Sequence, residues 1–150
     1  MSHTTTNVLI HYIFSTHHRT PFIKPEIESN LHAYLGGIMR EIGGIALCIN
    51  GMPDHVHLLV RMPSTQSVAD VARLVKTNSS RWVHERWPEY ECFAWQAGYG
   101  AFSIGQSGVS RVKAYIAQQE QHHHVKSFKE EFRSLLERYE LAFDEKYLWT

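Results

Sequence analysis

The spacing of hydrophobic residues divides the chain into strands and helices. A run of mostly β-branched and aromatic residues at 8–15 predicts a central strand that is buried on both faces. Residues 45–50 and 55–61 predict two more strands, and the turn Gly51-Met52-Pro53-Asp54 between them suits a hairpin. We therefore expect these three strands to form the centre of one sheet.

Apolar residues at helical spacing predict helices between and after the strands. The first helix carries such a stripe between Pro25, which suits a first helical position, and Gly43, which suits the end. Serine residues that can act as N-caps predict three more helices, beginning at Ser67, Ser107 and Ser127. The last of these serines begins a capping box, and its helix should run to about Tyr139.

The order of these elements predicts an α+β fold. A last pair of short strands is expected at residues 93–96 and 100–104, on either side of Gly98. The order β-α-β-β-α-β(β)-α-α is typical of a split β-α-β sandwich, ferredoxin-like or RRM-like, with an antiparallel central sheet and additional C-terminal helices. At 150 residues, the chain 1–150 should form a single domain with its core at about 8–140.

Composition narrows the function classes without choosing one. Lys+Arg and Asp+Glu both number 15, and this balance argues against broad nucleic-acid binding through total charge, although a local basic face is compatible with it. Cys48 and Cys92 have no C-x-x-C partner, which predicts two reduced, buried thiols in a cytoplasmic protein. No signal-peptide core or membrane-length apolar run is found, so no membrane partner is expected.

The richest candidate chemistry lies on the third strand and the third helix. Side chains alternate across a strand, so His55 and His57 should share one face and supply half of a metal site. Tyr115 and Gln119 stand four residues apart on a predicted helix and should also share a face. Two further histidines are candidates for supporting roles: His122, one turn past Gln119, and His11 on the first strand, a potential neighbour of His57.

These motifs resemble the single-tyrosine HUH transposases of insertion sequences and their relatives that act on repeated palindromic elements. The resemblance covers roughly residues 8 to 140. It rests on His55-Val56-His57, on Tyr115 with Gln119 and His122-His123, and on the segment Phe128-x-x-Glu131.

The resemblance implies a metal-dependent enzyme that cuts single-stranded DNA next to hairpins and rejoins it. Tyr115 would attack the scissile phosphate and leave a 5′-phosphotyrosine link and a free 3′-hydroxyl, so that rejoining needs no ATP. His55, His57 and Gln119 would hold Mg²⁺ or Mn²⁺. The resemblance also implies a homodimer with composite active sites, in which the tyrosine helix of one subunit serves the histidine strand of the other.

Basic residues on the second helix are candidates for contacts with the DNA backbone. Arg73, Lys76 and Arg81 share one side of this helix, and Arg19 and Lys113 could extend the surface. The alternative interpretation is an ordinary solvated helix face.

Two other functions stay open on the residues alone. A two-histidine phosphoesterase would use imidazoles as acid and base, but it needs a second related histidine motif and leaves Tyr115 unexplained. A non-catalytic nucleic-acid binder would use exposed aromatic residues on its central strands, where this chain carries histidines.

Overall fold

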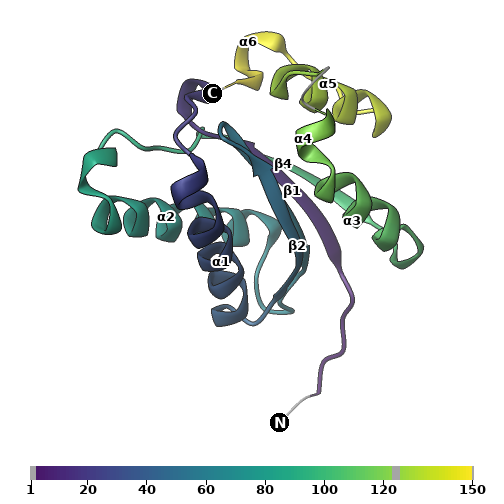
Figure 1. The fold of residues 1–150 in the computed structure, drawn as a ribbon. Helices are drawn as coiled ribbons and strands as arrows, with labels where there is room; N and C mark the ends of the chain where they lie inside the picture. The colour runs from purple at the N-terminus through teal and green to yellow at the C-terminus, as the bar shows by residue number, and fades with distance from the viewer. Residues whose placement is uncertain (1–2, 123–125, 150) are drawn as a thin grey trace.

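Four strands form one antiparallel sheet in the computed structural model, which describes residues 3–122 and 126–149. The strands are β1 (Leu9–Ser15), β2 (Ile45–Met52), β3 (His55–Arg61) and β4 (Gly100–Ile104), and they lie in the order β2-β3-β1-β4 (Figure 1). This order places β1 between β3 and β4, as two interleaved β-α-β units require. The predicted α+β, ferredoxin-like fold is confirmed.

Helices cover both faces of the sheet. On one face lie α1 (Pro25–Glu41) and α2 (Val68–Arg86), and on the other lie α3 (Val109–Ala117), α4 (Gln119–His122) and α5 (Phe128–Arg138) (Figure 1). The short helix α6 (Glu145–Leu148) follows α5. Three 3-10 turns connect these elements: η1 (His17–Arg19), η2 (Pro88–Tyr90) and η3 (Gln106–Gly108).

Two of the predicted serine N-caps are confirmed. The hydroxyl oxygen of Ser67 accepts a hydrogen bond from the backbone N–H of Asp70 at 3.0 Å, and that of Ser127 accepts from Glu130 at 3.2 Å. Each bond satisfies one of the free N–H groups in the first turn of its helix. These caps set the first residues of α2 and α5 where the sequence placed them.

Three local predictions were wrong. Residues 93–96 form no strand, because only an isolated bridge between Thr16 and Trp95 is made there. The third helix begins at Val109 instead of Ser107 and ends at Gln118 with φ −100° and ψ 25°, so Tyr115 and Gln119 do not share one unbroken helix. Cys92 is exposed and Cys48 is half-buried, although both thiols were expected in the core.

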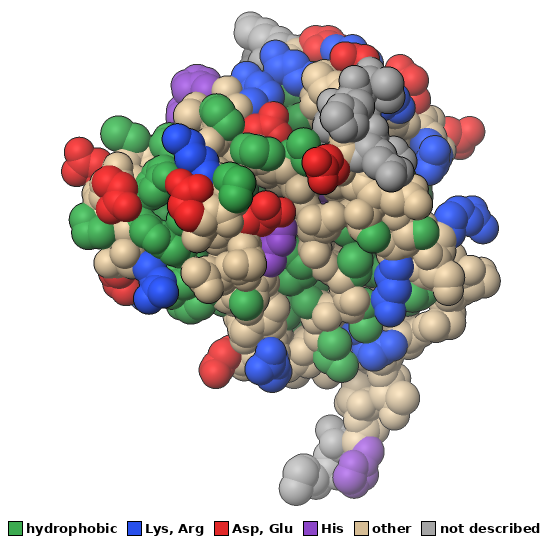
Figure 2. Space-filling model, in the orientation of Figure 1, with side chains coloured by type: hydrophobic (Ala, Val, Ile, Leu, Met, Phe, Trp, Pro, Cys, Tyr) green, Lys and Arg blue, Asp and Glu red, His purple; other side chains and the backbone are tan. Residues whose placement is uncertain are grey.

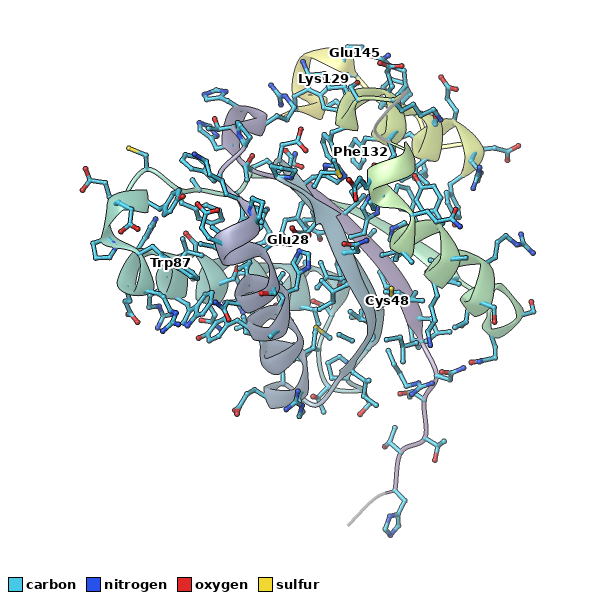
Figure 3. The ribbon with its side chains drawn as sticks, viewed as in Figure 1. Glu28, Cys48, Trp87, Lys129, Phe132 and Glu145 are labelled. Atoms are coloured by element: carbon cyan, nitrogen blue, oxygen red, sulfur yellow. The ribbon has the colours of Figure 1, made fainter. Side chains whose placement is uncertain are left out.

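Alternation along the central strands separates two apolar clusters. Val56, Leu58 and Val60 of β3 pack into the larger cluster, which lies under α1 and α2. On the opposite face a smaller cluster joins the sheet to α5, and Figure 3 labels Phe132 within it. The members of this smaller cluster are Ile13, Phe102, Phe128, Phe132, Leu135 and Leu136. Between this cluster and α3, the same face of β3 carries histidines.

The surface agrees with the balanced composition. Figure 2 shows basic and acidic side chains interspersed over the visible face of the molecule. Among the described residues, no helix has the length and apolar character needed to cross a membrane.

Candidate active site

The histidine pair is buried on the face of β3 that α3, α4 and α5 cover. His55 and His57 are both 0% exposed, although imidazoles are usually at least partly accessible. In the sheet they stand opposite Ser15 and Ile13 of β1. Gly51 of β2 makes this hairpin possible, because any side chain there would collide with the backbone of His55.

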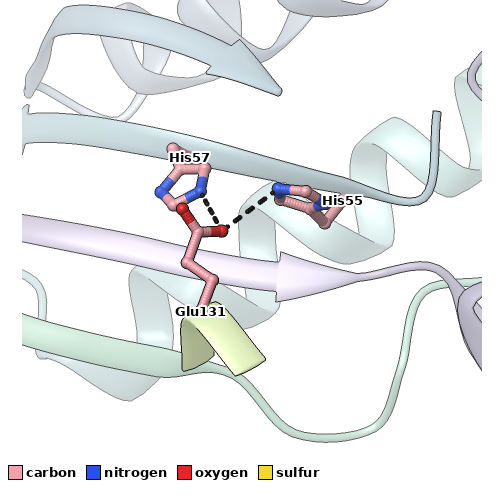
Figure 4. A group of neighbouring side chains, drawn as sticks. All are labelled: His55, His57 and Glu131. Carbon is pink, nitrogen blue, oxygen red and sulfur yellow. Dashed lines mark hydrogen bonds and ion pairs between the residues drawn. The ribbon is translucent and has the colours of Figure 1, made fainter. Parts of the chain in front are cut away.

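A carboxylate from α5 lies between the two imidazoles. Oε1 of Glu131 is 3.1 Å from Nε2 of His57 and 3.4 Å from Nε2 of His55 (Figure 4). Glu131 is 1% exposed, so this contact joins buried groups from elements far apart in the sequence. A buried carboxylate is tolerated only when it is paired, and here both of its oxygens have partners.

The second oxygen of Glu131 holds the predicted tyrosine and glutamine. The hydroxyl of Tyr115 donates to Oε2 of Glu131, and Nε2 of Gln119 donates to the same oxygen at 3.2 Å. Oε1 of Gln119 lies 3.1 Å from Nε2 of His55. The break between α3 and α4 therefore does not separate the two residues, because both still point at the same carboxylate.

Hydrogen bonds fix the outer nitrogen of each imidazole. Nδ1 of His55 lies 2.7 Å from Oδ1 of Asp54, and Nδ1 of His57 lies 2.8 Å from Nε2 of His11. Such partners select the tautomer and orient the ring of a metal-binding histidine. His11 thus contacts His57 from the neighbouring strand, whereas the side chain of His122 lies outside the described part of the chain.

The site strongly shifts the acidity of its members. Burial lowers the pKa of His55, but the hydrogen bonds and negative charges of Asp54 and Glu131 outweigh burial and raise it to about 9. Burial and the neighbouring His57 lower the pKa of His11 to about 3, so His11 is neutral. Burial, followed by the charge of Glu131, raises the pKa of Tyr115 well above its usual value. The phenol is therefore protonated in this state.

Asn50 ties the tyrosine helix to the histidine strand. It stands on β2 directly opposite His57, and its side-chain amide donates to the carbonyl of Ile116 at 2.9 Å. That carbonyl belongs to the last turn of α3, where backbone acceptors have no partner within the helix. The bond fixes the position of Tyr115, one residue before Ile116, relative to β3.

The donor set fits a divalent metal ion. His55, His57 and Glu131 each offer one ligand atom, and these atoms all lie within 4.8 Å of one another. Two imidazole nitrogens and a carboxylate oxygen are common ligands of divalent first-row metals. The prediction of a metal site at the histidine pair is thus supported by geometry, with Glu131 as an additional donor.

Two predicted DNA contacts are half-buried. The ammonium of Lys76 donates to the carbonyls of Ala97 at 3.0 Å and Gly98 at 2.8 Å, so it ties α2 to the segment before β4. Burial lowers its pKa to about 8. Arg19 lies in η1, and its Nη1 is buried with no hydrogen-bond partner.

The other predicted DNA contacts are exposed. Arg73 lies 3.8 Å from Asp70, and Arg81 donates to Asn78 at 2.9 Å, each pairing within α2. Lys113 is exposed on α3, on the other side of the sheet. The structure does not bring the five basic residues into one continuous surface.

Sequence reasoning assigned no role to Glu131, Asp54 or Asn50. A signal for Glu131 was present, because Phe128, Phe132 and Leu135 define an apolar stripe and Glu131 lies within it. A carboxylate at a core position of an amphipathic helix needs a buried partner, and the histidine pair is that partner. Asp54 and Asn50 carried no comparable signal, since both residue types are ordinary in and near turns.

Comparison with known proteins identifies the family of this chain. Residues 4–119 match the family described as "Transposase IS200 like". The chain is 24% identical over 114 residues to the ISDra2 transposase TnpA of Deinococcus radiodurans, covering 73% of this chain and 81% of that protein.

Two solved structures share the fold. One is a crystal structure of a transposase candidate from Deinococcus radiodurans R1, with a TM-score of 0.63 and 21% identity, covering 79% of this chain and 95% of that one. The other is a REP-associated tyrosine transposase bound to a REP hairpin, with a TM-score of 0.60 and 13% identity, covering 82% of this chain and 74% of that one.

The family match, together with a ferredoxin-like sheet whose buried histidine pair lies beside a tyrosine, identifies a tyrosine transposase. Because the family match extends over more than half of its length, the chain belongs to the IS200-like transposases. The predicted family and enzyme class are confirmed. Glu131 lies beyond the matched residues, so its part in the site comes from the geometry alone.

Proposed function

We propose that this transposase nicks and rejoins single-stranded DNA through a covalent link to Tyr115. The observation that carries the proposal is the convergence of Tyr115, Gln119 and the histidine pair on one buried carboxylate, Glu131. A structural core has no need for such a set of polar groups, since apolar residues would fill the space without unsatisfied partners.

We propose His55, His57 and Glu131 as metal ligands, with Gln119 beside them. The resemblance to HUH transposases suggested Gln119 as the third ligand, and its Oε1 lies 3.1 Å from His55. Oε1 of Glu131 lies 3.4 Å from His55 and 3.1 Å from His57, and Glu131 carries the negative charge that a dication favours. When bound, Mn²⁺ or Mg²⁺ would neutralise the scissile phosphate and stabilise charge on the leaving oxygen.

Glu131 also provides the proton acceptor for the nucleophile. A phenol with a raised pKa is a poor nucleophile unless its proton is removed as the new bond forms. In the proposed step the Tyr115 proton moves to Oε2 of Glu131 while the tyrosine oxygen bonds to phosphorus. The bond from phosphorus to the 3′ oxygen breaks, that oxygen takes a proton from solvent, and Glu131 releases its own proton to solvent. Rejoining runs the same path in reverse, with Glu131 returning the proton to Tyr115.

The proposed substrate is a single strand next to a DNA hairpin. The fold relative bound to a REP hairpin supports this choice. Opposite charges are balanced over the chain, so affinity should come from a few local contacts and not from a general field. Exposed Arg73 and Arg81 are proposed contributors.

The subunit arrangement has two alternatives. The resemblance predicts a homodimer with composite sites, whereas the geometry supports a site complete within one chain, since the Tyr115 ring lies 5.9 Å from that of His57. Mixing separates them: a double variant with His55→Ala and His57→Ala is combined with Tyr115→Phe. Restored cleavage in verified heterodimers would establish composite sites, and its absence would establish single-chain sites.

The main test is covalent capture. The protein is incubated with Mn²⁺ and a library of single strands that carry hairpins with randomised flanks, and denaturant-stable adducts are isolated and sequenced. Wild type should yield adducts at Tyr115, while Tyr115→Phe should yield none and still bind the captured sequences. Tyr90→Phe, a half-buried tyrosine on η2, is the matched control and should react normally. Adducts formed by Tyr115→Phe would contradict the assignment.

A further inference from the structure

A separate hollow opens beside the His55 end of the site. It has a volume of about 390 Å³ and lies between η1, the β2–β3 turn and the start of α5. Its polar lining includes Arg19, Asp54 and Lys126, and its apolar lining includes Met52 and Phe128. The hollow thus offers two cations and an aromatic ring to one occupant.

The hollow and the proposed metal site share a wall. Asp54 lines the hollow and lies 2.7 Å from Nδ1 of His55. The ring of Phe128 also lines it, with its centroid 4.9 Å from that of His55. An extended strand whose phosphate lies at the histidine pair would therefore place an adjacent nucleotide in this hollow.

The segment that carries Arg19 is held firmly against the β2–β3 turn. The backbone N–H of Thr16 donates to the carbonyl of Asp54, and that of Ile23 donates to Pro53, each at 2.9 Å. Arg19 itself has φ +57°, a left-handed conformation that an arginine adopts only when its surroundings fix it. Its Nη1 is buried without an acceptor. A buried guanidinium donor of this kind calls for an anionic oxygen.

The reaction geometry decides which nucleotide this is. The Tyr115 ring lies beside His57 and His11, with centroids 5.9 Å and 6.3 Å away, so the nucleophile approaches from the His57 side. In phosphoryl transfer the attacking and leaving oxygens lie roughly in line on opposite sides of phosphorus. The leaving 3′ oxygen therefore points away from Tyr115, towards His55 and the hollow.

We propose that the hollow at Arg19 binds the nucleotide that carries the leaving 3′ oxygen, with its phosphate on Arg19 and its base against Phe128. This inference rests on the proposed function and adds a task to it. After cleavage one DNA end is covalently attached to Tyr115, while the 3′-hydroxyl end is held only by non-covalent contacts. Arg19 keeps that end in place for rejoining.

Binding of the two cleavage products tests the proposal directly. In a Tyr115→Phe background, fluorescence anisotropy is measured for the captured sequence cut into its upstream strand, ending in 3′-hydroxyl, and its downstream strand. Arg19→Gln should lower the affinity for the upstream strand roughly tenfold and leave the affinity for the downstream strand unchanged. Arg40→Gln, an exposed arginine on α1 across the sheet, should change neither. Equal weakening of both strands, or none, would overturn the proposal.

Rejoining supplies an independent readout. With Tyr115 intact, Arg19→Gln should lower the ratio of rejoined to cleaved strand, and Arg19→Lys, which keeps the charge and loses the planar fork, should fall between it and wild type. Arg19→Lys also serves if thermal melting shows that Arg19→Gln is unfolded. Absence of any adduct in wild type would overturn the proposed function itself, whereas normal adducts with an unchanged rejoining ratio would overturn only the Arg19 site.

Discussion

The two faces of the sheet use the same strands and bury different chemistry. Towards α1 and α2, Val56, Leu58 and Val60 join a continuous apolar cluster. Towards α3 and α5, His55 and His57 are buried just as completely, among polar partners. Consecutive residues of β3 therefore belong to two different environments.

The difference separates stability from function along a single strand. An apolar side chain stabilises the fold in proportion to the area it buries, about 25 cal/mol per Å², and it needs no specific partner. A buried imidazole nitrogen that loses its partner instead leaves an unpaired polar group, which is costly in a low-dielectric interior. Substitutions at adjacent positions of β3 should therefore have different consequences: those on the apolar face should lower stability, and those on the histidine face should lower metal binding and activity.

The largest effect should come from the polar face. His57→Ala removes one proposed ligand and one of the partners of Glu131, so Mn²⁺ affinity should fall at least about a hundredfold, because even indirect supports of metal ligands contribute ten- to a hundredfold. Adduct formation should disappear with it. Titration calorimetry and the adduct assay measure the two losses, and Mn²⁺ binding that matches wild type would remove His57 from the ligand set.

Substitution of Leu58, the residue after His57, should lower stability and leave metal binding intact. Leu58→Ala leaves a cavity under α1 and α2, since Leu58 is 1% exposed, and should lower the free energy of unfolding by about 2–5 kcal/mol. The protein that remains folded should bind Mn²⁺ as wild type does. Denaturant unfolding and calorimetry below the transition check both statements. A metal-affinity loss as large as that of His57→Ala would show that the two faces are not independent.

Metal binding should depend on pH through His55. In the metal-free protein its pKa is raised from 6.5 to about 9, so below pH 9 the metal must displace a proton. Mn²⁺ affinity should then rise by about tenfold per pH unit from pH 6.5 upward and level off near 9. Calorimetry in buffers of different ionisation enthalpy should record the released proton.

The raised pKa of His55 should also make the stability of the metal-free protein fall with pH, whereas Mn²⁺ affinity rises. A raised pKa means that the folded protein holds the proton more tightly than the unfolded chain does. In the absence of metal, the stabilisation from protonated His55 is therefore complete below pH 6.5 and is lost as pH rises through about 9. His55→Gln should flatten this part of the stability profile, and an unchanged profile would contradict the assignment.

Local patterns predicted the parts of the site that lie within one element. Strand alternation placed His55 and His57 on one face, and the four-residue spacing directed Tyr115 and Gln119 to one place. The break at Gln118 escaped prediction, because that segment has no Gly or Pro and the helix ends under tertiary contacts such as the one from Asn50. This error did not move a site residue, since Tyr115 from α3 and Gln119 from α4 bind the same carboxylate.

Contacts between segments that are far apart in the sequence could not be predicted from local patterns. Glu131 joins the site only because α5 docks on the sheet through Phe132, Leu135 and their neighbours, and no local rule gives that docking angle. In the same way, Lys76 was grouped with Arg73 as a candidate DNA contact because the two residues share one side of the helix. Its ammonium is instead bound by two carbonyls from residues 97 and 98. Sequence spacing identifies which side of a helix a residue occupies but not what approaches that side.

The smallest expected effects are those of substitutions at Arg73 and Lys76, which should change different properties of the protein. Arg73 is exposed, so Arg73→Ala should reduce the slope of log affinity against log salt for hairpin DNA by about one and leave the melting temperature unchanged. Lys76→Ala should act on the fold, because it leaves two carbonyls without their donor, and the expected loss of about 1 kcal/mol lowers the melting temperature by about 2–4 °C.

Salt-dependent binding and thermal melting together show whether Arg73 and Lys76 contact the DNA backbone. If Lys76→Ala changes the salt slope while its melting temperature stays at the wild-type value, Lys76 contacts phosphate and its bonds to the Ala97 and Gly98 carbonyls open when DNA binds. If Arg73→Ala leaves the slope unchanged, this side of α2 is an ordinary solvated surface. In that case the contacts with DNA would lie on the face of the sheet that carries the histidines, and Lys113, which is exposed there, is the next basic residue to test.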